Sequence, residues 1–266
     1  MDLELKGKAA IVTGGNRGIG KAIARELAKE GVNVAILARD KAALTAAADE
    51  IGRGTNAKVL HIATDTGEDA AVKKAVAEVA AAFGRIDILV NCAAQPGGQG
   101  KPPALGEITN EHFWADMNVK VLGYLRTARE VAPHMIKQKS GRIINVSGLA
   151  ARNTGTIIGS MRNVAVAALT KNLADELSPH GIAAICVHPG LTRTEKTPGV
   201  VAAQAKAQGV PEAEIEARMA GRNLSRKLIT AEDIASVVVF LASPRSVAIN
   251  GDVIAAGGGS PGSIHY

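Results

Sequence analysis

The sequence predicts a single α/β domain, a doubly wound, seven-stranded parallel sheet with helices on both faces. Short apolar runs, typical of strands that are buried on both faces, alternate along the chain with stretches of helical period. No internal repeat or low-complexity linker divides the 266 residues, so one domain is expected over residues 1–266. Apolar residues make up 47% of the chain and aromatic residues only 2%, so Ala, Val, Ile and Leu must build the core.

The expected elements alternate along the whole chain. Strands are expected at residues 9–12, 32–38, 58–63, 86–91, 142–147, 182–188 and 252–255. Helices are expected at residues 21–30, 41–53, 68–83, 111–137 (where Pro133 could introduce a bend), 163–177 and 231–241. Between them, a Gly/Pro-rich loop is expected at 95–104, and two short helices at 200–221 within a mobile lid of about 195–225. Such alternation implies right-handed crossovers, so ligands should bind at the carboxyl ends of the strands.

A glycine-rich stretch, T-G-G-N-R-G-I-G at residues 13–20, lies between the first strand and the first helix. Glycines let the backbone approach a pyrophosphate, and the free N–H groups and dipole of the helix N-terminus bind its charge. The stretch therefore predicts a dinucleotide-binding turn.

The end of the second strand indicates which dinucleotide is preferred. Many dinucleotide folds place an acid there, to hold the adenosine ribose hydroxyls. Here Ala38 is followed by Arg39, and Arg17 lies inside the glycine turn. Both guanidinium groups could pair with a 2′-phosphate, which favours NADP(H) over NAD(H), although they could also be ordinary surface arginines.

Small and polar residues follow three other strands. Asp65 and Thr66 come after the third strand, where a carboxylate could accept a hydrogen bond from adenine or simply belong to the start of the next helix. N-C-A-A begins at Asn91 after the fourth strand, and P-G-L-T-R-T begins at Pro189 after the sixth. All three segments are expected at the ligand-binding edge of the sheet.

Composition argues against several other classes of function. The net charge of +6 is spread along the chain and aromatic residues are scarce, so nucleic acid is not expected as a partner. No apolar run reaches the roughly 18–20 residues of a membrane span, and no secretory signal is recognised. Cys92 and Cys186 are expected to be buried, reduced thiols, which suits a cytoplasmic protein, and no metal site is predicted.

Together, these motifs resemble the short-chain dehydrogenase/reductase family, of the T-G-x-x-x-G-I-G type, along essentially the whole chain. The resemblance includes M-N-V at Met117, G-R-I-I-N-V-S at Gly141 and L-T-K at Leu169. It implies a Rossmann-type domain that binds NADP(H), and assembly into homodimers or homotetramers through the helices at 111–137 and 163–177. The residues expected to hold the cofactor are Gly14, Asn16, Arg17, Gly18, Ile19, Gly20, Arg39, Asp65, Thr66, Asn91, Ala93, Asn163, Pro189, Gly190, Thr192 and Thr194.

The resemblance is incomplete at the catalytic residues. The family usually has an Asn, a Ser and a Y-x-x-x-K pair, in which the Tyr passes a proton and the Lys lowers its pKa. Asn118 stands at the Asn position, and Ser147 stands at or beside the Ser position, which one alignment gives to Gly148. Alignment from L-T-K puts Gly159 at the Tyr position and Asn163 at the Lys position, whereas alignment from Ser147 or Gly148 gives Ser160 with Val164 or Met161 with Ala165.

Other residues of the chain do not restore this pair. The tyrosines are Tyr124 and Tyr266, and no lysine lies between Lys139 and Lys171. A positioned general acid contributes about 10²- to 10⁴-fold in rate, although a water relay near Ser147 and Asn118 could replace it.

Three functions are therefore weighed. The first is an NADP(H)-preferring oxidoreductase that interconverts a small carbonyl compound and an alcohol, with an atypical proton-transfer site. The second is a catalytically degenerate NADP(H)-binding pseudoenzyme, and the third is a non-redox enzyme on the same fold.

Overall fold

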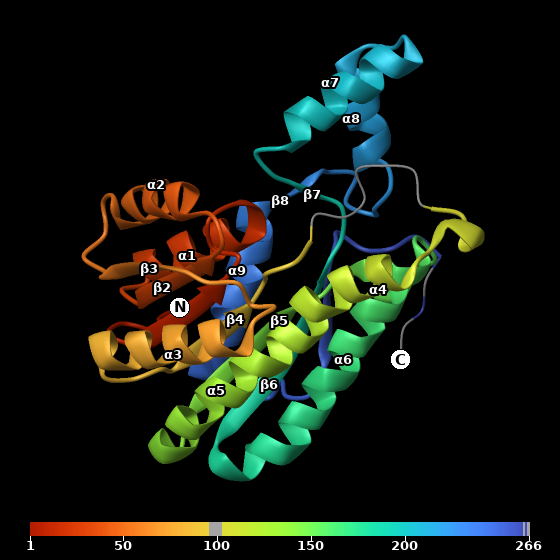
Figure 1. The fold of residues 1–266 in the computed structure, drawn as a ribbon. Helices are drawn as coiled ribbons and strands as arrows, with labels where there is room; N and C mark the ends of the chain where they lie inside the picture. The colour runs from red at the N-terminus through yellow and green to blue at the C-terminus, as the bar shows by residue number, and fades with distance from the viewer. Residues whose placement is uncertain (96–102, 263, 265–266) are drawn as a thin grey trace.

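The computed structural model describes residues 1–95, 103–262 and 264, so most of the predicted loop at 95–104 and the C-terminal Tyr266 lie outside it. Figure 1 shows a layered α/β arrangement with helices on both faces of a central sheet. The sheet has seven parallel strands in the order β3-β2-β1-β4-β5-β6-β9. This confirms the predicted fold class.

The element bounds agree closely with the alternation in the sequence. The sheet strands are β1 (Ala9–Thr13), β2 (Asn33–Ala38), β3 (Val59–Ala63), β4 (Ile88–Asn91), β5 (Gly141–Val146), β6 (Ile182–Pro189) and β9 (Val253–Ala256), and a small separate pair is β7 (Thr192–Arg193) and β8 (Ile229–Thr230). The helices are α1 (Gly18–Lys29), α2 (Lys41–Gly52), α3 (Asp69–Phe83), α4 (Asn110–Met117), α5 (Gly123–Gln138), α6 (Ile157–Leu177), α7 (Thr197–Gln208), α8 (Glu212–Ala220) and α9 (Ala231–Ala242).

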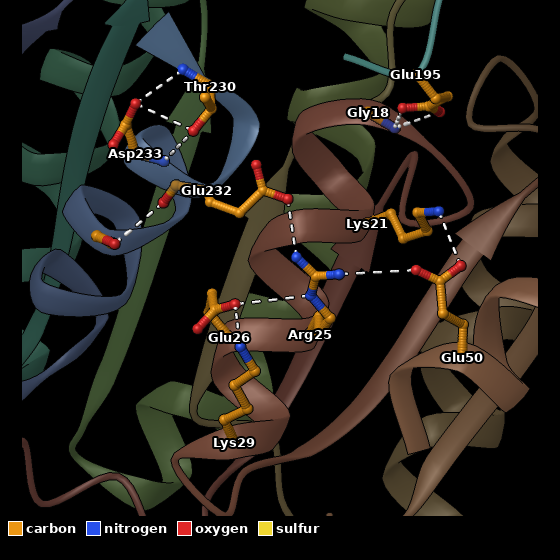
Figure 2. Close-up of polar contacts among 11 residues, drawn as sticks. Gly18, Lys21, Arg25, Glu26, Lys29, Glu50, Glu195, Thr230, Glu232 and Asp233 are labelled. Atoms are coloured by element: carbon orange, nitrogen blue, oxygen red, sulfur yellow. Dashed lines mark hydrogen bonds and ion pairs between the residues drawn. The ribbon is translucent and has the colours of Figure 1, made fainter. Parts of the chain in front are cut away.

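The core lies on the two faces of the sheet. Successive side chains of a strand point to opposite faces, so Val12 of β1 packs with α1, α2 and α9, while its neighbour Ile11 packs with α3, α5 and α6. On the first face, Arg25 of α1 binds Glu232 of α9 at 2.8 Å and lies 3.7 Å from Glu50 of α2, as Figure 2 shows. Helix α1, which follows the glycine turn, is thereby held on both sides.

The helix expected at 111–137 is interrupted, and not at Pro133. Pro133 lies inside continuous α5, whereas α4 and α5 are separated by a π-helical turn, Asn118–Leu122. The N–H of Gly123 donates to the carbonyl of Asn118, five residues back, which is the π-helical pattern. Helical periodicity alone did not reveal this turn, because the apolar positions continue across it.

Helix α6 begins at Ile157, six residues before the expected start at 163. Thr156 caps it by accepting a hydrogen bond from the N–H of Gly159 at 3.0 Å. The early start places both Gly159 and Asn163 on the helix. The two short helices expected at 200–221 are confirmed as α7 and α8, which pack on each other through Val201 and Ile215 and stand off from the layers in Figure 1. The mobility of this segment remains a prediction.

A buried polar network joins β4, β5, α5 and α6. The amide of Asn91 donates to Asn145 at 3.0 Å, and the amide of Asn145 donates to Thr170 at 2.9 Å. The hydroxyl of Thr127 donates to the side-chain oxygen of Asn91 at 2.6 Å. All four side chains are fully buried, so the network fixes the carboxyl ends of the central strands.

We expect Thr127→Val to lower the free energy of unfolding by about 1–2 kcal/mol, because the isosteric change leaves the buried Asn91 oxygen without its donor. Thr45→Val on α2 is the matched control. The Thr45 hydroxyl contacts a carbonyl four residues back in its own helix, as the Thr127 hydroxyl does, but Thr45 is exposed. The control should change stability by less than about 0.5 kcal/mol in urea unfolding. Equal effects would show that the network adds nothing.

Candidate active site

The glycine turn lies directly against the segment after β4. A Cβ on Gly14, whose φ is +68°, would come within 3.0 Å of the Ala93 backbone, and one on Gly20 would lie 2.3 Å from the Gly14 carbonyl. The hydroxyl of Thr13 accepts hydrogen bonds from the N–H groups of Cys92 and Ala93, at 3.0 and 3.1 Å. Only glycine at positions 14 and 20 allows the backbone segments to approach this closely. The two bonds to Thr13 fix the start of the turn against the segment after β4.

The N-terminus of α1 binds an anion from the chain itself. The N-cap residue Arg17 makes no side-chain capping bond, and the N–H of Gly18 donates to both carboxylate oxygens of Glu195, at 2.9 and 3.2 Å. Figure 2 shows the Glu195 carboxylate directed at this N–H. A carboxylate here satisfies a free N–H group and interacts favourably with the helix dipole, as a phosphate would.

A cavity of about 590 Å³ runs along the turn and the ends of β1–β4. The predicted cofactor residues that line it are Gly14, Asn16, Arg17, Gly18, Ile19, Gly20, Arg39, Asp65, Thr66, Ala93 and Thr194. Lining residues that the prediction did not include are Leu37, Ala38, Asp40, Ala43, Thr64, Cys92, Ala94, Gln95, Val119, Glu195 and Lys196. Most of these adjoin a predicted position, so a wider window around each strand end would have included them.

Two arginine side chains lie at the rim of the cavity, which Lys196 also lines. Arg17 and Arg39 are exposed, and neither makes an ion pair with a residue in the described part of the chain. The neighbouring Asp40 does not neutralise them by pairing, because its carboxylate caps α2 by accepting from the N–H of Ala43 at 3.0 Å. Asp65 lies deeper, and one of its oxygens accepts from the N–H of Gly67 at 2.8 Å. The cavity therefore offers guanidinium groups and a helix N-terminus to a phosphorylated ligand.

The remaining predicted cofactor residues lie outside this lining. Asn91 is fully buried in the network described above. Pro189 ends β6, and a Cβ on the following Gly190 would come within 2.9 Å of Gly257. Thr192 donates to the Gly190 carbonyl at 3.0 Å, which closes the turn after β6. Their predicted roles toward a cofactor remain predictions.

Ser147 and Asn163, two of the predicted site residues, meet at the carboxyl end of β5. The Ser147 hydroxyl contacts the main-chain carbonyl and the side-chain oxygen of Asn163, at 3.0 and 3.1 Å. The third, Asn118, turns elsewhere, and its amide donates to the carbonyl of Gly67 at 3.3 Å. The structure thus brings Ser147 and Asn163 together but shows no direct bond from either to Asn118.

Lys120 joins this pair, although the sequence analysis did not identify it. Its ammonium donates to the carbonyl of Ser147 and to the side-chain oxygen of Asn163, both at 2.9 Å. The side chain is only 5% exposed, and burial, with the nearby Arg162 guanidinium, lowers the pKa of Lys120 to about 8. The only sequence signal was its place in M-N-V-K, two residues after Asn118.

Tyr124 does not supply an acidic phenol to this site. Its hydroxyl donates to the carbonyl of Val146 at 2.9 Å, and burial raises the pKa of Tyr124 well above the usual value.

Gly159 is buried on α6, where a Cβ would lie 2.3 Å from the Thr156 hydroxyl. The thiols of Cys92 and Cys186 are both free, but only Cys186 is buried as expected, since Cys92 is half-buried and lines the cavity. Desolvation raises the pKa of Cys92 to about 11 and that of Cys186 to about 12, so both remain protonated.

Comparison with known proteins identifies the family. The family model for short chain dehydrogenases matches residues 8–205. The chain belongs to the short-chain dehydrogenase family. A "Short-chain reductase protein NovJ" of Streptomyces niveus is 34% identical over 253 residues, which are 95% of this chain and 93% of that protein. A "Sorbitol dehydrogenase" of Cereibacter sphaeroides is 33% identical over 247 residues, covering 92% and 93%.

A solved structure agrees with the fold over essentially the whole chain. L-Sorbose reductase from Gluconobacter frateurii, complexed with NADPH and L-sorbose, superposes with a TM-score of 0.92 at 28% identity. The match covers 99% of this chain and 100% of that one. Within the described residues of the present chain, no helix has the length and apolar character needed to cross a membrane.

We expect Glu195→Gln to tighten NADPH binding about fivefold, because the carboxylate occupies the N–H group that a cofactor phosphate would use. The free energy of unfolding without cofactor should fall by up to about 1 kcal/mol, because a neutral amide interacts less favourably than a carboxylate with the dipole of α1. Calorimetric titration and thermal melting measure the two effects, and the control is Glu78→Gln, an exposed position in the interior of α3. Weaker NADPH binding in Glu195→Gln would instead make Glu195 a cofactor ligand.

Proposed function

We propose that this chain is an NADP(H)-dependent oxidoreductase that interconverts a small carbonyl compound and an alcohol, without the usual Tyr–Lys pair. The observation that carries this proposal is the cavity in which the N-terminus of α1 lies beside Arg17 and Arg39, whose guanidinium groups make no ion pair with any residue that the structure describes. The similarity to a reductase complexed with NADPH supports the same conclusion. Membership of a family of dehydrogenases favours redox chemistry over a non-redox use of the fold.

The residues of the cavity have distinct tasks in this proposal. The N–H of Gly18 would bind the pyrophosphate after Glu195 withdraws, and Arg17 and Arg39 would pair with the 2′-phosphate. A bound NADPH supplies the hydride that reduces the carbonyl carbon. Ser147, at the carboxyl end of β5, would donate a hydrogen bond to the substrate oxygen in place of its bond to Asn163.

A second candidate, an NADP(H)-binding pseudoenzyme, is favoured by one observation. The only tyrosine in the described residues, Tyr124, is bonded to Val146 and fully buried, so no phenol faces Ser147. Tight NADPH binding without turnover of any carbonyl compound would support this candidate. In either case we propose one domain over 1–266 with a lid at about 195–225, a cytoplasmic location and no nucleic-acid partner.

We expect NADPH oxidation with at least one compound in a panel of small ketones, aldehydes and keto sugars that includes L-sorbose.

Arg17→Gln and Arg39→Gln should each raise the Kd for NADPH about tenfold and leave that for NADH nearly unchanged, because each removes a charge-assisted bond to the 2′-phosphate. Fluorescence titration measures both affinities. The exposed Arg53→Gln is the control, since Arg53 lies outside the cavity lining. Equal losses for NADPH and NADH would contradict the assignment of the two arginines.

We also propose a homodimer or homotetramer that packs through α4, α5 and α6. Apolar side chains are exposed on α6, where Ile157, Met161 and Val164 have exposed fractions of 49%, 50% and 51%, and Trp114 on α4 is 57% exposed. A stripe of this kind on consecutive turns of one helix is typical of a protein interface.

Met161→Glu should dissociate this assembly, because it buries a carboxylate at the apolar contact, whereas Leu224→Glu, a change at a 65% exposed site, should leave the mass unchanged. Sedimentation velocity measures the mass of each variant. A parent protein that sediments as a clean monomer would remove the proposal.

A further inference from the structure

One buried cation at the carboxyl end of β5 has no task in the cofactor cavity. Lys120 comes from the π-helical turn between α4 and α5, and its neighbour Val119 lines the cavity while Lys120 turns inward. A buried ammonium is costly unless acceptors surround it, and two lie at 2.9 Å, the carbonyl of Ser147 and the side chain of Asn163. π-Turns are often found at functional sites.

The position of this ammonium matches a missing part of the site. In the alignment from L-T-K, Asn163 takes the position of the family's lysine, and the Lys120 ammonium is hydrogen-bonded directly to that Asn. The Ser147 hydroxyl contacts the same Asn163 oxygen at 3.1 Å. The side-chain oxygen of Asn163 therefore holds the Lys120 ammonium and the Ser147 hydroxyl beside each other. In the family pattern, the positive charge would instead come from a lysine on the helix that carries Asn163.

We propose that Lys120 supplies the positive charge and the proton of the reactive site, and that Ser147 passes this proton to the substrate oxygen. The inference rests on the proposed oxidoreductase function. Lys120 acts through Ser147, so it is a positioning and proton-supplying residue and does not itself touch the substrate.

The proton balance is complete without another co-reactant. Addition of a hydride to the carbonyl carbon moves the C=O π pair onto oxygen, which becomes an alkoxide. Ser147 turns its hydroxyl from Asn163 to this oxygen and donates its proton, so an O–H bond forms. The Lys120 ammonium then returns a proton to Ser147, directly or through one water, and solvent protonates the resulting amine. Alcohol oxidation runs through the same steps in reverse.

The charges around Lys120 determine the pH range in which it works. Besides its two acceptors, it faces the Arg162–Asp116 ion pair of α6 and α4 and the thiols of Cys92 and Cys186. Burial comes first among the causes that lower its pKa to about 8, so the ammonium predominates at neutral pH and the amine predominates above pH 8. Reduction should therefore slow as pH rises through about 8, whereas alcohol oxidation should speed up over the same range.

The decisive variants are Lys120→Met and the double variant Lys120→Met/Asn163→Lys. We expect the single change to lower kcat for reduction by about 10²-fold or more, with the Kd for NADPH within about threefold of the parent. The double variant returns an ammonium to the neighbourhood of Ser147 from α6, and we expect it to recover at least about tenfold of the loss. A lysine that only supports the fold would not be rescued from another helix. The control is Lys137→Met, an exposed lysine at the end of α5.

Two results would overturn the proposal. One is a kcat in Lys120→Met within about threefold of the parent. The other is a parent pH profile that stays flat between pH 7 and 9.5. Thermal melting and NADPH titration of each variant distinguish loss of activity from loss of fold.

A second readout needs no turnover, so it separates this proposal from failure of the proposed function. The oxidised nicotinamide ring is cationic, and a buried ammonium near it disfavours NADP⁺ relative to NADPH. We expect Lys120→Met to increase the affinity for NADP⁺ relative to NADPH by about 3- to 10-fold, even if no carbonyl compound in the panel is reduced. An unchanged ratio would show that the Lys120 charge does not act on the reactive site.

Discussion

The free N–H groups at the start of α1 favour an anion, and the part of the molecule around the glycine turn supplies one from the chain itself. Arg17 provides no cap from its side chain, so Glu195, from a distant segment, supplies a carboxylate to Gly18. The close fit of Gly14 against Ala93 leaves the helix end facing an open cavity with two guanidinium groups at its rim. The first N–H groups of a helix have no acceptor within the helix, and at α1 these groups therefore form the anion site.

The polar cluster at the carboxyl end of β5 follows the same electrostatic rule with the opposite sign. There a buried cation, Lys120, requires acceptors, and the carbonyl of Ser147 and the side chain of Asn163 provide them. The network of Asn91, Asn145, Thr127 and Thr170 lies alongside and fixes the strands that carry these groups. Because the strands of the seven-stranded sheet are parallel, the glycine turn after β1 and Ser147 after β5 both lie at the carboxyl ends of the strands.

Local pattern was sufficient where one interaction dominated. Apolar runs predicted each main strand within about two residues, because a parallel strand covered on both faces leaves little room for polar side chains. Pattern was insufficient at two helix boundaries, where a single turn decided the outcome. The cap from Thr156 starts α6 early, and the bond from Gly123 to Asn118 creates the π-turn, while Pro133 fits inside α5 without ending it. Neither of these bonds changes the spacing of apolar residues.

The sequence by itself determined the fold class, the glycine turn, the two arginines of the cavity and the presence of only two tyrosines, because these depend on residue identity and short-range spacing. Only the tertiary structure decided what Glu195, Tyr124 and Lys120 contact, since each of their partners comes from a segment distant in the chain. A lysine in a helical stretch is normally solvated. Its burial beside Ser147 results from the π-turn and from the packing of α6 against that turn and against β6, which no short window of sequence contains.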